Sequence, residues 1–343
     1  MSGTDEQQQK SNSQKILWLS IIQGYAILLV LIGHVNGYTY NEPDELYPLS
    51  DFIHRLSSSF HMPLFMFVSG GLLYFSRISK NWSTGKLYKD KARRLLLPFI
   101  FFTIVGFVAK IPFMSVAKTA HDMSFYGFLN AFFSPIQGPL KEMWFVGTLM
   151  WLMALYPVYK SMLKNPFTEI MLLVITLIPF IDGVKPNIDG WFHLSGVFSY
   201  AFYFVAGMLF FKYNMTALFE KSKAAVVCVT VCYLCLFFLD IESLKLLTVV
   251  TGILATFGIG VHVAKRFPHL FSSFRDHSFQ IFLVGIFPQM IIELLVWRHV
   301  HAAGMQLPYF IVSVSLALFT GVLVSKIGQR LSSKYLRWCL GLK

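Results

Sequence analysis

The chain has 343 residues, of which 55% are hydrophobic and 13% are charged. This composition excludes a water-soluble globular protein and makes lipid the solvent for most of the chain. We therefore attribute the net charge of +12 to membrane topology and to contact with anionic lipid, and we expect no nucleic-acid partner.

Long apolar runs define the predicted elements. Residues 1–14 are polar and lack a secretory signal, so we expect a disordered tail there. In hydrocarbon a segment must pair its own backbone groups, so the apolar runs predict transmembrane helices. We expect these helices at 16–37, 57–76, 94–114, 143–162, 167–182, 192–212, 223–239, 244–264, 278–298 and 306–326. The shorter run 125–133 predicts an interfacial or re-entrant helix. The expected fold is all-α, a polytopic bundle of about ten helices, with 15–343 as a single membrane domain.

Basic residues are distributed unevenly between alternate loops, which predicts the orientation of the bundle. Of 29 Lys and Arg residues, 22 lie on one side, within 10–15, 77–94, 160–164, 212–223, 265–275 and 326–343. By the positive-inside rule both termini are cytoplasmic, and we expect a multi-pass protein of the bacterial inner membrane. The four cysteines lack metal-binding or disulfide spacing, so no metal site is expected.

Two histidines lie at similar depth near the predicted outer face. His34 is near the outer end of the first helix, and His61 is near the outer end of the second, which runs back across the membrane. Ionisable groups inside spans are costly, which makes them functional candidates. Imidazole has a pKa near 6.5, so it can remove a proton from an attacking hydroxyl at neutral pH. In the alternative interpretation each ring bonds a helix carbonyl, in the case of His61 one that Pro63 leaves unpaired.

Further candidates follow on the same side. Glu142 opens the fourth helix and is either an orienting acid or a solvated helix-start residue. Trp144 and Phe145 are candidates for stacking on a sugar or on the pantetheine arm of an acyl donor, although interfacial anchoring is the commoner role of such rings. Glu293 and Arg298 close the ninth helix and are candidates for substrate contact.

A basic cluster precedes the third helix on the predicted cytoplasmic side. It contains Lys91, Arg93 and Arg94, and it ends shortly before Pro98. Such side chains can hold the phosphates of an acyl-coenzyme A, and Arg94 lies nearest the bundle. The alternative is a topology signal in contact with anionic lipid.

Several fragments in order resemble the acyltransferase-3 family of membrane acyltransferases, over nearly the whole length from Lys15 to Lys343. The first helix contains Trp18-Leu19, Gly24 and a run that ends in Gly33-His34, and the second runs from Phe60-His61-Met62-Pro63 to Ser69-Gly70. The later fragments are Lys91, Arg93, Arg94 and Pro98; Met143-Trp144-Phe145; Phe202-Tyr203-Phe204 with Gly207; and Leu340-Gly341.

The resemblance implies transfer of an acyl group, usually acetyl from acetyl-CoA, to a hydroxyl of an envelope polysaccharide or a lipid-linked sugar. It implies that acyl-CoA is a donor substrate and that no cofactor is permanently bound. His34 would be the general base, with His61 and Glu142 orienting it or the acceptor. Nothing in the sequence specifies an oligomeric state.

The chain departs from the family pattern at two positions. Gln23, eleven residues before His34, stands where many members carry a basic residue, so it can hydrogen-bond the donor but cannot neutralise its charge. Gly285 stands where relatives often have histidine. Because of these two departures, a second function is considered for the chain: it exports or transports a glycan or a small acid and performs no acyl transfer. A scaffold in a polysaccharide assembly complex is a weaker alternative.

Overall fold

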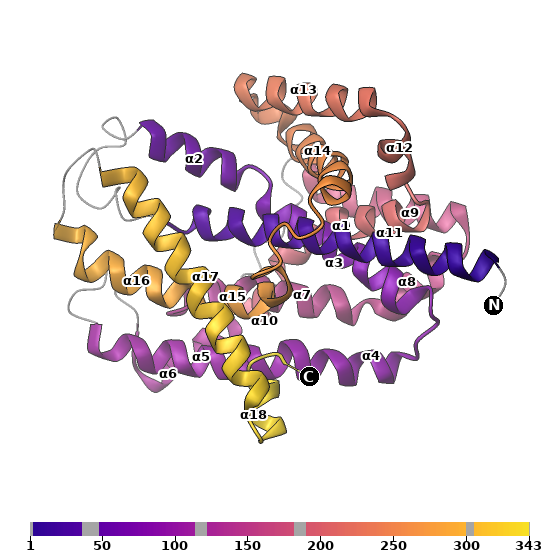
Figure 1. Cartoon of the computed structure of the whole chain (residues 1–343). Helices are drawn as coiled ribbons and strands as arrows, with labels where there is room; N and C mark the ends of the chain where they lie inside the picture. Colours follow the sequence, from indigo (N-terminus) through magenta and orange to yellow (C-terminus); the bar gives the residue numbers. More distant parts are fainter. Residues whose placement is uncertain (1–2, 36–47, 114–121, 182–189, 300–304, 343) are drawn as a thin grey trace. The chain divides into compact units, whose positions relative to one another are not determined.

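The computed structural model describes residues 3–35, 48–113, 122–181, 190–299 and 305–342. Helices dominate this part of the chain, which contains no strand (Figure 1). The chain divides into two compact units, each built from segments far apart in sequence. The first unit comprises 1–68 and 213–326, and the second comprises 69–212 and 327–343. The prediction of one membrane domain from residue 15 to 343 stays a prediction.

The first unit contains α1 (Gly3–Gly33), α2 (Pro48–Ser58), the beginning of α3 (His61–Leu73), α12 (Thr216–Lys221), α13 (Lys223–Leu239), α14 (Lys245–Arg266), α15 (Ser278–Val284), α16 (Ile286–Leu295) and most of α17 (Gln306–Arg330). Helix α1 packs against α14 and α15, and Trp18 of α1 meets Phe257 of α14 edge to face. Helix α1 begins at Gly3, inside the predicted tail.

The second unit contains α4 (Thr84–Lys91), α5 (Leu97–Lys110), α6 (Phe125–Phe133), α7 (Met143–Ala154), α8 (Tyr156–Met162), α9 (Pro166–Leu177), α10 (Gly190–His193), α11 (Ser195–Lys212) and α18 (Lys334–Cys339). Gly70 lets the α3 segment approach α11, because a Cβ at this position would collide with the carbonyl of Phe204. The helix predicted at 125–133 is present as α6.

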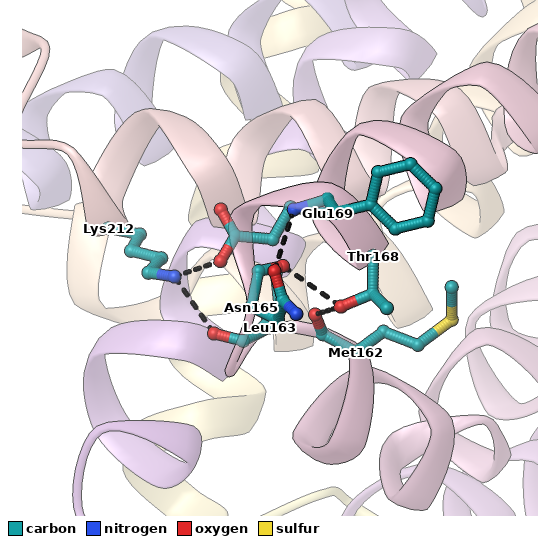
Figure 2. A network of polar contacts seen from close by, with 7 residues as sticks. Met162, Leu163, Asn165, Thr168, Glu169 and Lys212 are labelled. Atoms are coloured by element: carbon teal, nitrogen blue, oxygen red, sulfur yellow. Dashed lines mark hydrogen bonds and ion pairs between the residues drawn. The ribbon is translucent and has the colours of Figure 1, made fainter.

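A buried ion pair joins the start of α9 to the end of α11 (Figure 2). Lys212, at the end of α11, pairs with Glu169, whose side chain is 3% exposed, and its ammonium also donates to the carbonyl of Leu163 at 2.8 Å. Asn165 caps α9 by accepting from the amide of Phe167. A buried carboxylate is tolerated only where a cation and further hydrogen bonds compensate it, so this network fixes the α9 terminus.

Each of the ten predicted spans overlaps one or more helices, although turns interrupt several of them, as at 59–60 between α2 and α3. Among the described residues, five helical stretches are long and apolar enough to cross a membrane: Phe52–Ile78, Thr84–Lys110, Gly190–Lys212, Glu242–Arg266 and Leu307–Arg330. Shorter apolar helices cover Leu17–Gly33, Met143–Ala154, Pro166–Phe180 and Lys223–Leu239. The chain is thus a polytopic helical membrane protein, while ten crossings and cytoplasmic termini stay predictions.

The ninth predicted span is broken. Helices α15 and α16 meet at Gly285 with a bend of 51°. Pro288 has no amide hydrogen to donate to the carbonyl of Val284 and its ring crowds that carbonyl, which accounts for the bend. The helix between Thr84 and Lys110 also contains a π-helical turn at Ala92–Leu96, just before Pro98. Such turns are frequent at functional sites.

Candidate active site

The structure brings His34 and His61 together within the first unit. His34 follows the last residue of α1, and His61 begins α3. A Cβ placed on Gly33 would lie 3.7 Å from Cε1 of His61 and 3.5 Å from Oγ of Ser57. These distances and the packing of α1 against α2 show that the chain returns beside the end of α1, and both rings are half-buried there.

Backbone contacts fix the tautomer of both rings. Nδ1 of His34 lies 2.7 Å from the carbonyl oxygen of Val30, and Nδ1 of His61 lies 2.8 Å from that of Ser57. A carbonyl oxygen only accepts, so Nδ1 carries the hydrogen and donates. In the neutral ring the basic lone pair is then on Nε2, the nitrogen that can take a proton from a substrate.

A residue outside the sequence-based predictions holds the turn before His34. Gln289 of α16 is 4% exposed, and its Nε2 donates to the carbonyl of Leu31 at 3.0 Å. The same carbonyl accepts from the amide of His34 at 3.3 Å. Oε1 of Gln289 is buried and has no hydrogen-bond partner among the described residues. Leu31 and Gln289 are separated by 258 positions, and no spacing pattern links them.

The other predicted residues of the first unit lie on α1 and near the end of the broken span. Gln23 is half-buried. It precedes His34 by eleven residues, or about three helical turns, so the two residues lie on the same face with their backbones about 16 Å apart along the helix axis. Glu293 is half-buried one turn after Gln289. Arg298 lies in a short turn at Trp297–His299, and its side chain is outside the described part. A Cβ on Gly285 would approach Leu31 at 3.0 Å, so this position is closely packed.

Three predicted residues of the second unit lie at the start of α7. Glu142 precedes α7, and its side chain does not cap that helix. The ring of Trp144 stacks on Tyr200 with centroids 5.3 Å apart, and Phe145 is 5% exposed. Packing within this unit accounts for both rings. Contact of these three residues with substrate stays a prediction.

The basic cluster forms two different kinds of contact. Arg94 pairs with Asp90 at 3.2 Å, and Asp90 also pairs with Arg77 at 3.2 Å. Arg93 instead stacks over the ring of Trp338, with Cζ 4.4 Å from the ring centroid. Lys91 is half-buried at the start of the π-helical turn. The two arginines are adjacent in sequence, yet one faces a carboxylate and the other an aromatic ring.

Comparison with known proteins decides the family. A family model described as an acyltransferase domain matches residues 16–326. The chain belongs to the acyltransferase-3 family. The chain is 32% identical over 106 residues to the nodulation protein NolL of Mesorhizobium japonicum. The match covers 30% of the chain and 28% of that relative, so the chain spans less than a third of its length. No solved structure matches.

Membership confirms the family that the resemblance in sequence indicated. Its matched residues include both histidines and the cluster from Lys91 to Arg94, but they end before α18.

Proposed function

We propose that this membrane acyltransferase transfers an acyl group, acetyl in the simplest case, from cytoplasmic acyl-CoA to a hydroxyl of an envelope polysaccharide or a lipid-linked sugar, in the bacterial inner membrane. The observation that carries the proposal is the pair of imidazoles at the end of α1, each with Nδ1 on a carbonyl and its lone pair on Nε2. In this tautomer Nε2 carries the lone pair that can accept the proton of a sugar hydroxyl.

In the proposed reaction Nε2 of His34 takes the hydroxyl proton as the oxygen attacks the thioester carbonyl carbon. The carbon–sulfur bond breaks, the thiolate of coenzyme A leaves, and the imidazolium returns the proton to the sulfur. The products are an O-acyl ester and free coenzyme A. His61 is the second imidazole of the pair and orients His34 or the acceptor.

The test uses purified protein in lipid nanodiscs, radiolabelled acetyl-CoA and an envelope glycan extract. We expect alkali-labile label on the glycan, because an ester is cleaved by mild base and an amide is not. His34→Ala should lower kcat about a hundredfold to ten-thousandfold, the contribution of a general base. The control is His269→Ala, at an exposed loop histidine. Full transfer by His34→Ala would refute the assignment of the base.

The broken span favours one alternative function. Discontinuous helices recur at the binding sites of transporters, and the 51° bend at Gly285 is a break of this kind. An exporter of a glycan or a small acid would move its cargo into proteoliposomes without any acyl donor. Donor-independent flux that survives His34→Ala would support export, whereas label transfer without such flux supports acyl transfer.

A further inference from the structure

The end of α2 is capped by residues that follow it in the chain. The last carbonyl groups of a helix have no amide partner inside it, so other donors must satisfy them. The amide of Ser59 donates to the carbonyl of Arg55 at 3.0 Å, and Oγ of Ser59 donates to that of Leu56 at 2.8 Å. Nδ1 of His61 donates to the carbonyl of Ser57 at 2.8 Å. His61 is therefore part of the cap of α2, and the orientation of its ring depends on where the last turn of that helix lies.

Tyr233 of α13 anchors this turn from a distant part of the sequence. Its side chain is 7% exposed, and its hydroxyl lies 3.0 Å from Oγ of Ser59. Because Ser59 gives its hydrogen to the carbonyl of Leu56, its oxygen accepts the hydrogen bond from Tyr233. A directed chain of hydrogen bonds thus runs from Tyr233 through Ser59 to the turn that also binds His61.

Packing within the first unit holds the ring of Tyr233 in place. The ring meets Phe60 edge to face, with centroids 5.4 Å apart. Gly252 of α14 lets both rings approach, because a Cβ there would lie 2.9 Å from Phe60 and 3.0 Å from Tyr233. One turn further along α13, Phe237 meets Phe52 of α2 with centroids 6.1 Å apart. The hydroxyl of Tyr233 is therefore already fixed, so its bond to Ser59 requires little further loss of conformational freedom.

A second polar contact joins α13 to α2 without reaching the cap. Asp240, which lies about two turns after Tyr233, pairs with Arg55 at 3.7 Å. These side chains are 65% and 46% exposed, and an exposed ion pair contributes little to stability. Asp240 contacts α2 through a side chain, whereas Tyr233 acts on the carbonyl groups of its last turn. The two residues thus allow a matched comparison on one helix.

We propose that Tyr233 is a positioning residue that orients the imidazole of His61 through Ser59. This inference rests on the proposed function, in which His61 orients His34 or the acceptor. Tyr233 touches no reacting atom in this proposal. Without its hydroxyl the ring still fills its space, but the last turn of α2 loses an anchor and Nδ1 of His61 loses a fixed partner. Ser59 and Tyr233 are separated by 174 positions.

The experiment measures acetyl-transfer kinetics and thermal unfolding in lipid nanodiscs. The variants are Tyr233→Phe, Ser59→Ala and the two changes together. The controls are Asp240→Asn and Tyr159→Phe, the latter at a buried tyrosine whose hydroxyl has no hydrogen-bond partner in the described chain. We expect Tyr233→Phe to lower kcat about tenfold to a hundredfold, as the misplacement of a catalytic group does. The KM for acetyl-CoA and the thermal midpoint should stay near those of the wild type, and both controls should keep the wild-type kcat.

A double-variant comparison tests the route through Ser59. Residues that act through one hydrogen-bond chain have effects that do not add. The double variant should therefore lose no more kcat than Ser59→Ala alone. Losses that multiply would show that Tyr233 acts by another route and would overturn the inference. Wild-type kcat in Tyr233→Phe, an equal loss in Asp240→Asn, or a loss that disappears well below the thermal midpoint would also overturn it.

Nitrogen NMR of protein with isotopically labelled histidine reads the tautomer without any turnover. The signals of His61 are those missing from His61→Ala, and the spectra are recorded at a pH where the ring is neutral. We expect the hydrogen on Nδ1 in the wild type and a mixture of tautomers in Tyr233→Phe. If the wild-type protein transfers no acetyl, the proposed function fails, and these spectra still decide whether Tyr233 orients the ring. The same single tautomer in both proteins would overturn the inference.

Discussion

Replacing Gln289 by methionine should separate stability from activity at the end of α1. Methionine has the same chain length without a branch, so it fills the buried space of Gln289, which is 4% exposed. The change removes the hydrogen bond from Nε2 to the carbonyl of Leu31, 3.0 Å away, and it removes Oε1, which is buried without a partner in the described part of the chain. These two losses act on stability with opposite signs.

The magnitudes follow from the contacts. Losing the Leu31 hydrogen bond costs about 0.5–1.5 kcal/mol, near the lower end because the amide of His34 still donates to this carbonyl. Removing the unpaired buried oxygen returns about 1–3 kcal/mol of desolvation free energy. The variant should therefore unfold at the wild-type temperature or above it. Its kcat should nevertheless fall about tenfold, because the carbonyl of Leu31, in the turn before His34, keeps only one of its two hydrogen bonds. This loss is a part of the hundredfold to ten-thousandfold that a general base contributes.

Thermal unfolding and acetyl-transfer kinetics on the same nanodisc preparation test this, with the neighbouring substitution Met290→Leu as the control. Wild-type kcat in Gln289→Met would show that Leu31 needs no anchor for catalysis. A loss of stability of more than about 2 kcal/mol would show that the amide oxygen is satisfied in the native protein, contrary to the magnitudes above.

Two further predictions concern packing. Glu169→Gln should destabilise the protein by up to about 3–5 kcal/mol, because it leaves the charge of Lys212 without its carboxylate. The double variant Glu169→Met with Lys212→Met should keep a stability near that of the wild type. A thermal midpoint of the single variant equal to that of the wild type would contradict this. Gly70→Ala should cost about 1–3 kcal/mol because its Cβ meets the carbonyl of Phe204. Gly85→Ala, where no atom of the described chain lies within 4 Å of a Cβ, should instead gain about 0.5–1 kcal/mol. Equal midpoints for the two alanine variants would refute the packing argument.

The sequence predicts the helices well because apolar length and proline position act locally. Hydropathy locates both the long helices and α6. Two consecutive antiparallel helices bring the end of the first close to the start of the second, so the order of the helices is enough to predict that His34 lies near His61. The break near Gly285 is readable from Pro288, although hydropathy alone predicts one continuous helix over 278–298.

Contacts between distant segments were not predictable in this way. Nothing in the local pattern links Gln289 to Leu31, or Trp338 to Arg93, because each pair depends on how helices pack after they form. The pairing of Arg94 with Asp90 is different because it is local: residues at i and i+4 of a helix lie on the same face, so their spacing predicts the pair. The charge of Arg94 alone predicts a phosphate ligand, and its pairing with Asp90 makes this role less favourable.

The interleaved layout of the two units constrains the order in which the protein is assembled during synthesis. Residues 69–212 leave the ribosome as an almost complete block of the second unit, whereas the first unit needs segments from both sides of that block. Helix α1 is made early, but the side of it that packs against α14 and α15 is covered by protein only after these two helices have been made. In a stalled or prematurely terminated chain of about two thirds of the length, α1 would still pack against α2, but its contacts with α14 and α15 would be missing, which makes such a chain a target for membrane quality-control proteases.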